Sequence, residues 1–163
     1  MTHLRDALGK VLDAYDARRQ AEQSRLENAK RDEAQFLERF DELCRTQVRP
    51  VFEEAGAMLA ERGHRSSVTE QPFAVDASGK VTEARLSLHV VPAGMGSPAR
   101  MESHAWTLSV STRHYNKSVW FDAGAAMSEG GMTGSKAAFP LDKVDRQLVE
   151  EQVVRFVGGI VAG

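Results

Sequence analysis

The first 62 residues show the spacing of apolar and polar positions that is typical of helices. No Gly occurs between Lys10 and Ala55, and the strong helix formers Ala, Leu, Glu, Gln and Arg dominate. Near the start, apolar residues recur at spacings of four and three, which places them on one helix face. They are Leu4, Leu8, Val11 and Tyr15. Arg18, Arg19 and Glu22 then occupy the positions where the next apolar residues would fall, so this apolar face is short.

A broader apolar stripe begins at Phe36 and predicts a helix that faces the core of a globular domain. Its members are Phe36, Leu37, Phe40, Leu43, Cys44, Val48, Val51, Phe52, Ala55, Met58 and Leu59. Pro50 lacks a backbone N–H, so we expect it to kink the helix or to mark a restart. Gly63 is expected to end the helix, because glycine is common just past helix C-termini.

Residues 1–33 are therefore predicted to form a helical arm, and residues 34–163 a single globular domain. The arm either folds back on the next helix as a hairpin or pairs with a second copy of the chain as a coiled coil. The segment that would have to turn, RLENAKRDEAQ, contains no Gly and no Pro, which favours pairing. Leu4, Leu8, Val11 and Tyr15 would then be the dimerisation residues.

After Gly63 the pattern changes to alternation of apolar and polar residues, which indicates strands. Two strands are expected around a turn at residues 76–79, where Gly79 suits a positive φ. Their apolar residues are Val68, Phe73 and Val75 in the first strand, and Leu86, Leu88 and Val90 in the second.

A further strand at residues 101–115 would place His104, Trp106, Leu108 and Val110 on one face. Its other face carries Ser and Thr, as on the solvated side of an antiparallel sheet. The sequence YNKS then predicts a hairpin turn, SVWFDA the returning strand, and KAAFPL a short last strand.

The last segment, LDKVDRQLVEEQVVRFVGGIVAG, predicts an amphipathic helix with Asp142 as its N-cap and Asp145 in the first turn. The expected fold class is α+β. It comprises a long N-terminal helix, or two helices, an antiparallel sheet of four to five strands, and the C-terminal helix packed on the sheet. The apolar residues of that last helix are Leu148, Val149, Val153, Phe156, Val157 and Ile160.

Composition narrows the function classes. The 21 Lys and Arg residues against 23 Asp and Glu give a net charge of −2, without the basic excess of a nucleic-acid-binding protein. The sequence shows no apolar run of membrane-spanning length and no signal peptide, so we expect no membrane partner and a cytoplasmic location. Cys44, the one cysteine, rules out an intramolecular disulfide and a multi-cysteine zinc site. On the apolar stripe, it is expected to act as a small hydrophobic residue.

Two motifs suggest chemistry but lack the required spacing. His89, His104 and His114 lie within 26 residues, yet His89 and His104 are expected on opposite sides of the sheet, so no metal site is predicted. Two Gly-rich segments, 92–100 and 123–135, are expected to be loops. The second contains GGMTGSK, but Ser135 separates Gly from Lys, so it is not a phosphate-binding loop.

The sequence RHYNKSVW is the candidate ligand-binding surface, because it interleaves basic and aromatic residues. Its members are Arg113, His114, Tyr115, Lys117 and Trp120. The leading hypothesis is a non-enzymatic interaction or adaptor protein: a homodimer, joined through helices, that binds another protein. The alternative is a domain, which could be an enzyme, that binds a small ligand or anion between the sheet and loops 92–100 and 123–135. No cofactor and no catalytic residues are predicted.

Overall fold

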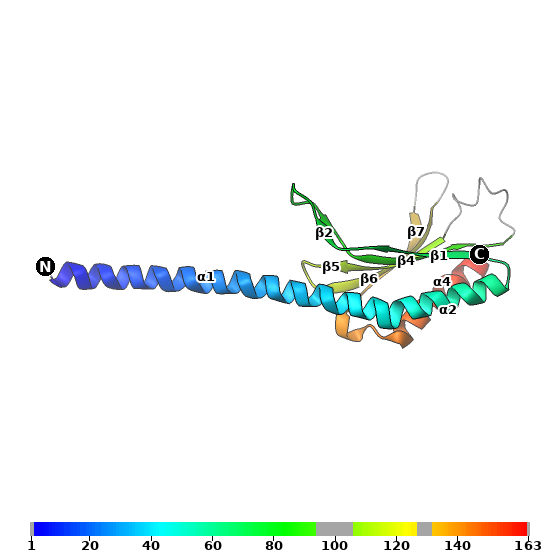
Figure 1. Ribbon diagram of the computed structural model, residues 1–163, viewed down its shortest axis with the longest axis horizontal. Coiled ribbons are helices and arrows are strands. Elements are labelled where there is room, and N and C mark those ends of the chain that lie inside the picture. Colours follow the sequence, from blue (N-terminus) through cyan, green and yellow to red (C-terminus); the bar gives the residue numbers. More distant parts are fainter. Residues whose placement is uncertain (1, 94–105, 127–131, 163) are drawn as a thin grey trace. The chain divides into compact units, whose positions relative to one another are not determined.

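The N-terminal helix α1 spans Thr2–Leu43 without a break (Figure 1) in the structure, a computed structural model that describes residues 2–93, 106–126 and 132–162. The contacts divide the chain into two compact units, Met1–Gln35 and Phe36–Gly163. Helix α1 contains no turn within the segment RLENAKRDEAQ, at which the expected hairpin would have to reverse. The helix-forming residues of that segment, without Gly or Pro, give the backbone no reason to leave the helix.

Helix α1 continues into one turn of π-helix, η1 (Cys44–Val48), and then into α2 (Arg49–Glu61). The expected restart at Pro50 is confirmed, because this residue lies in the first turn of α2, directly after the π-helical turn. Gly63 ends the helix at a φ of +84°. The N–H groups of Gly63 and His64 donate to the carbonyls of Ala60 and Leu59, which is a Schellman cap.

Five antiparallel strands in the described part of the chain form the main sheet, in the order β1-β4-β5-β6-β7. They are β1 (Arg65–Gln71), β4 (Arg85–Val91), β5 (Trp106–Arg113), β6 (Ser118–Ala126) and β7 (Met132–Pro140). Each strand pairs with its neighbours in the order, and the tight turn between β5 and β6 occupies residues 114–117. The α+β class with an antiparallel sheet of four to five strands is therefore confirmed.

The strands differ from the expected ones in two places. Phe73 and Val75 do not continue β1: β2 (Ala74–Val75) and β3 (Val81–Thr82) form a separate two-stranded ribbon. The ribbon's turn is the expected one, with Gly79 at a φ of +86° and its N–H donating to the Asp76 carbonyl.

The predicted loop at 123–135 is wrong for most of its length. Residues 123–126 belong to β6 and residues 132–135 to β7, and they pair with one another from Ala123 opposite Ser135 to Ala126 opposite Met132. Small residues with low strand propensity are held in the sheet by this pairing. Residues 127–131, and residues 94–100 of the other predicted loop, lie outside the described residues.

The C-terminal helix α4 (Arg146–Ala162) begins after Asp145, whose Oδ1 accepts the N–H of Leu148 at 2.9 Å. Asp145 is thus the N-cap, and the assignment of Asp142 to that role is wrong. Asp142 lies in a short 3-10 helix, η3 (Leu141–Lys143), and its carboxylate pairs with Arg39. An N-cap residue lies directly before the first residue of a helix. Because η3 occupies residues 141–143, α4 begins only after Asp145.

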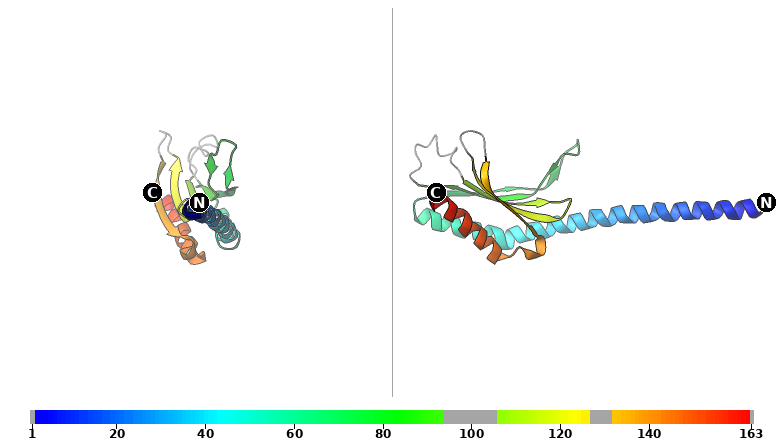
Figure 2. Two further views of the ribbon diagram at one scale, coloured as in Figure 1. Left: turned by 90° about the vertical axis from the view of Figure 1, so that its left-hand side faces the viewer. Right: turned by 180° about the vertical axis from the view of Figure 1, so that it is seen from behind.

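The core of residues 36–163 lies between the sheet and the helices. Figures 1 and 2 show α2 and α4 on the same side of the sheet, which agrees with the contacts of α4 with α2 and β5. All the predicted core residues of the helices are buried or partly buried except Met58, which is 60% exposed. The sheet contributes alternate residues, which are Leu86, Leu88, Val90, Leu108, Val110, Val119 and Phe121. No helix within the described residues has the length and apolar character needed to cross a membrane.

Candidate functional site

The sheet has a polar face on the side opposite its core residues. Because side chains alternate along a strand, the residues between the buried ones point away from the helices. On the central strands, this polar face consists of Arg85, Ser87, His89, Thr107, Ser109, Ser111, Arg113, Ser118, Trp120 and Asp122. Strands β1 and β7 add Arg65, Ser67, Thr69, Gln71, Lys136, Ala138 and Pro140.

Hydroxyl groups on the polar face form a hydrogen-bonded network around His89. The two ring nitrogens of His89 lie 2.7 Å from Thr69 Oγ1 and 3.0 Å from Thr107 Oγ1. Ser87 Oγ lies 2.8 Å from Ser109 Oγ in the next row. Burial lowers the pKa of His89, which favours the neutral imidazole that donates through one nitrogen and accepts through the other.

The Ser and Thr residues of β5 are not the solvated face that alternation predicted. Ser109 and Ser111 are buried, and so is Ser87 on β4. Their hydroxyls are short, whereas Arg85, His89 and Trp120 on the same face have long or wide side chains. A residue on a polar face of a sheet can therefore be buried, as Ser87, Ser109 and Ser111 are.

Four of these residues form a cluster that we name the arginine cluster: Arg85, Ser111, Arg113 and Trp120. Ser111 is directly opposite Arg85 on β4 and Trp120 on β6, and Arg113 lies two residues further along β5. The Arg113 guanidinium carbon lies 5.4 Å from the centre of the Trp120 ring, a cation–π contact. Trp120 is held in turn by its Nε1–H, which donates to Ser118 Oγ at 3.0 Å.

The polar atoms of the arginine cluster are incompletely paired. Ser111 is 0% exposed, and its Oγ has no hydrogen-bond partner among the described residues. The Arg113 Nη1 donates to the Thr112 carbonyl at 3.1 Å. Among the described residues, no carboxylate lies within ion-pair distance of the Arg85 or Arg113 guanidinium. Two cations and a buried hydroxyl therefore occupy neighbouring register positions without a carboxylate partner in the described part of the chain.

The structure describes all five residues of the predicted ligand-binding surface, which lie at the hairpin of β5 and β6. Arg113 and Trp120 lie together on the polar face, as described. His114 is bound to Glu83, and its ring makes edge contacts with Phe73 and Tyr115. Tyr115 is 71% exposed in the turn between β5 and β6, where Lys117 adopts a positive φ of 54°. The prediction missed Ser111 because it treated the hydroxyls of β5 as solvated. The prediction also did not include Arg85.

Other candidate chemistry is accounted for by packing. Burial raises the pKa of the Cys44 thiol to about 12, so the nucleophilic thiolate is disfavoured at neutral pH. Cys44 lines a hollow of about 110 Å³ together with Phe40, Phe73 and Leu86, which has room for about one side chain. His89 and His114 have separate partners, and His104 lies outside the described residues. Within residues 2–93, 106–126 and 132–162, no group of three His, Cys, Asp or Glu side chains is placed to hold a metal ion.

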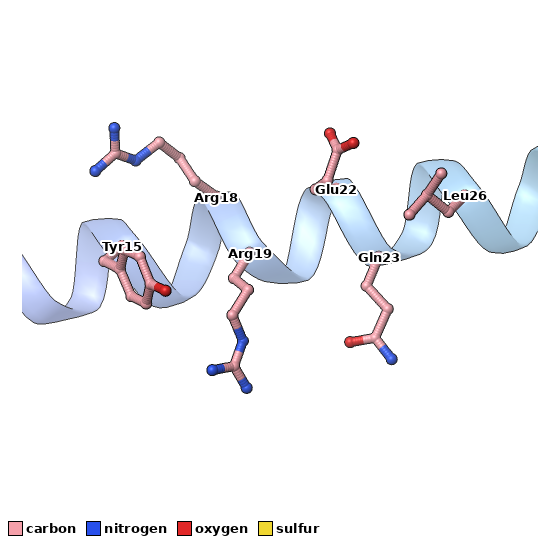
Figure 3. Close-up of a pocket in the computed structure, with 6 residues that line it drawn as sticks. All are labelled: Tyr15, Arg18, Arg19, Glu22, Gln23 and Leu26. Carbon is pink, nitrogen blue, oxygen red and sulfur yellow. The ribbon is translucent and has the colours of Figure 1, made fainter.

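The arm carries an apolar stripe whose members are 50–67% exposed: Leu4, Leu8, Val11, Leu12 and Tyr15. Leu12 was missed by the sequence analysis, although it lies four residues after Leu8 and three before Tyr15. The same face continues as a shallow hollow from Tyr15 to Leu26 (Figure 3). Arg18 and Glu22 point to one side of the helix, and Arg19 and Gln23 point to the other.

The comparisons with known proteins add no assignment. No protein-family model, curated protein or solved structure matches the chain. Two surfaces of this chain are therefore the candidates for function: the apolar stripe of the arm and the arginine cluster.

Proposed function

We propose that this protein is a non-enzymatic interaction protein that forms a homodimer through its N-terminal helix and binds another protein. The observation that supports this proposal is the apolar stripe of the arm. Five large apolar side chains lie within 12 residues of one helix, and each is at least half exposed. Exposed apolar patches of this kind are typical of protein interaction surfaces.

Energetics favour covering the stripe. Complete burial of a Leu, Val or Tyr side chain is worth about 1.5–3 kcal/mol, so covering the exposed half of each contributes about 1 kcal/mol. Most helices in water also depend on packing of an apolar face rather than on helix propensity. A second copy offers a complementary stripe without any further partner, and a two-fold dimer is the simplest assembly that covers both.

Charge along the same face favours antiparallel pairing. The stripe's spacing of three and four continues from Tyr15 to Arg18, Glu22 and Arg25. In a parallel dimer in register, each of these residues would face its own copy, so that like charges would meet. In an antiparallel dimer whose stripes face each other, Leu4 lies opposite Tyr15 and Leu8 opposite Val11, so the charged residues lie beyond the paired stripes and like charges do not meet.

The proposal is tested on the full-length protein by size-exclusion chromatography with light scattering. We expect a mass of about twice the 17.9 kDa of one chain. Leu8→Glu combined with Val11→Glu places charges in the stripe and should give a monomer. Ala17→Glu is the matched control, because residue 17 lies on the opposite side of the helix. A monomeric parent protein, or a double variant that remains dimeric, would overturn the proposal.

Orientation is tested with a cysteine at the start of the stripe. Because Cys44 is buried, the thiol of Leu4→Cys would be the one available for a disulfide in the folded protein. In an antiparallel dimer the two copies of residue 4 lie far apart, so mild oxidation should give no covalent dimer. Rapid formation of that dimer would show parallel pairing.

Binding of another protein is tested by using the parent protein, Ala17→Glu and the double variant as immobilised baits. A partner that uses the dimer should be captured by the parent protein and by Ala17→Glu, but not by the double variant. Equal capture by all three proteins would show that binding of the partner does not require the apolar stripe.

A further inference from the structure

The arginine cluster has an excess of positive charge. The described strand residues of the polar face include four basic residues and one acidic residue, Asp122. The basic residues are Arg65, Arg85, Arg113 and Lys136. Asp122 lies directly opposite Lys136 on β7. The carboxylate of Glu83, near the end of β4, is engaged by His114 and Thr112. The charge of Arg85 and Arg113 is therefore not neutralised by these neighbours.

Ser111 adds an independent observation. A buried hydroxyl without a hydrogen bond costs about 1–3 kcal/mol, and more than nine in ten buried polar groups in proteins have partners. Ser111 lies between Arg85 and Trp120 across the strands, with Arg113 next to it on its own strand. A negatively charged oxygen at this position would accept from the hydroxyl and from the guanidinium groups at once.

We propose that the arginine cluster binds the oxyanion group, carboxylate or phosphate, of a small molecule. Arg85 and Arg113 donate to the oxyanion, and Ser111 supplies a hydroxyl. Trp120 is a positioning residue that holds the Arg113 side chain by the cation–π contact. Because Ser111 is 0% exposed, side chains around it have to shift for the ligand to reach the hydroxyl.

This site is independent of the arm, and it differs from the predicted ligand-binding surface. Arg113 and Trp120 are retained, Arg85 and Ser111 are added, and His114, Tyr115 and Lys117 are not needed. Planar guanidinium groups form two parallel hydrogen bonds with carboxylate or phosphate, which is why arginine recognises both.

The experiment is an NMR titration of the ¹⁵N-labelled full-length protein with inorganic phosphate and, separately, with acetate. Sodium chloride at matched ionic strength is the control for screening. We expect saturable shifts of the Trp120 indole N–H and of the Arg113 backbone N–H with at least one oxyanion, and none with chloride. The absence of saturable shifts with both oxyanions would overturn the proposal. The relative affinities of the two probes distinguish a phosphate ligand from a carboxylate ligand.

Variants make the assignment specific. R85Q and R113Q should each weaken binding about tenfold, because each removes a charged hydrogen bond to the anion. R65Q is the matched control: it removes the same charge from the same face, on β1, and should leave the affinity unchanged. Ser111→Ala should weaken binding about threefold. An equal loss in R65Q and R85Q would show general attraction to a basic surface, and would overturn the site.

Discussion

The Nδ1 atom of His114 lies 2.9 Å from Oε2 of Glu83, and both side chains are mostly buried. The Glu83 carboxylate also accepts the backbone N–H of His114 at 3.0 Å and the hydroxyl of Thr112 at 3.3 Å. This one carboxylate therefore connects the segment between β3 and β4 to the end of β5. The two-stranded ribbon begins beside it, where Phe73 contacts the His114 ring at 5.4 Å between centroids.

Replacing Glu83 should destabilise the fold. Glu83→Ala leaves donors of His114 and Thr112 without an acceptor, which we expect to lower the free energy of unfolding by about 2 kcal/mol. Urea denaturation followed by circular dichroism measures this change. Glu53→Ala is the control, because Glu53 forms an exposed pair with Arg49 at 3.7 Å and should cost less than about 0.5 kcal/mol. Equal effects of the two substitutions would contradict the role assigned to Glu83.

Two glycines should respond in opposite ways to alanine. In α4, a Cβ at Gly158 would meet no atom within 4 Å, so Gly158→Ala should raise the free energy of unfolding by about 0.5–1 kcal/mol through helix propensity. Gly63 has a φ of +84°, which side chains disfavour, so Gly63→Ala should lower it by about 1 kcal/mol. Thermal unfolding of both variants measures the difference, and changes of the same sign would contradict it.

The buried thiol should make stability fall at alkaline pH. Burial raises the pKa of Cys44 from an ordinary value of 9.0 to about 12, so the unfolded chain loses this proton first as the pH rises. The contribution to stability is complete below pH 9 and is lost towards pH 12, by at most about 1.4 kcal/mol per pH unit. Cys44→Ala should lack this component, so the stability difference between parent and variant should narrow above pH 9. If the free energy of unfolding of the parent protein and of Cys44→Ala changed equally with pH, this prediction would be contradicted.

His89 should have the opposite effect, at acidic pH. Burial lowers the pKa of His89, so the unfolded chain binds this proton first as the pH falls below about 6.5. The stability that depends on the neutral ring is therefore present above that pH and is lost as the pH falls through the lowered pKa. We expect the parent protein to lose stability more steeply than His89→Asn between pH 7 and pH 5 in urea denaturation. A variant with the same slope would exclude His89 as the cause.

Local signals in the sequence located most of the fold. Gly63 marks a helix end because positive φ suits glycine, and the alternation of Leu86, Leu88 and Val90 identifies the buried side of β4. The errors arise where distant residues decide the local structure. Residues 132–135 are a strand because β6 lies beside them, and η3 moves the start of α4 to the position after Asp145.

The candidate site was harder to predict than the fold, since it depends on strand register. Interleaved charge and aromatic character indicated Arg113 and Trp120. But nothing local to Ser111 shows that Arg85 lies across from it, 26 positions earlier in the chain. Nor does composition show that a serine on a polar face is 0% exposed. Sequence patterns assign a residue to a face of the sheet, and register determines its neighbours.

The strand order has a consequence for how copies of this chain can meet. Among the described strands, β1 and β7 each have one neighbour in the sheet, so each offers backbone groups to which another strand could add. Both edges carry residues that discourage such addition. β1 has exposed Arg65 and Glu70, and β7 has exposed Lys136 and ends at Pro140, which has no N–H to donate. These edge residues thus disfavour open-ended addition of strands to the sheet.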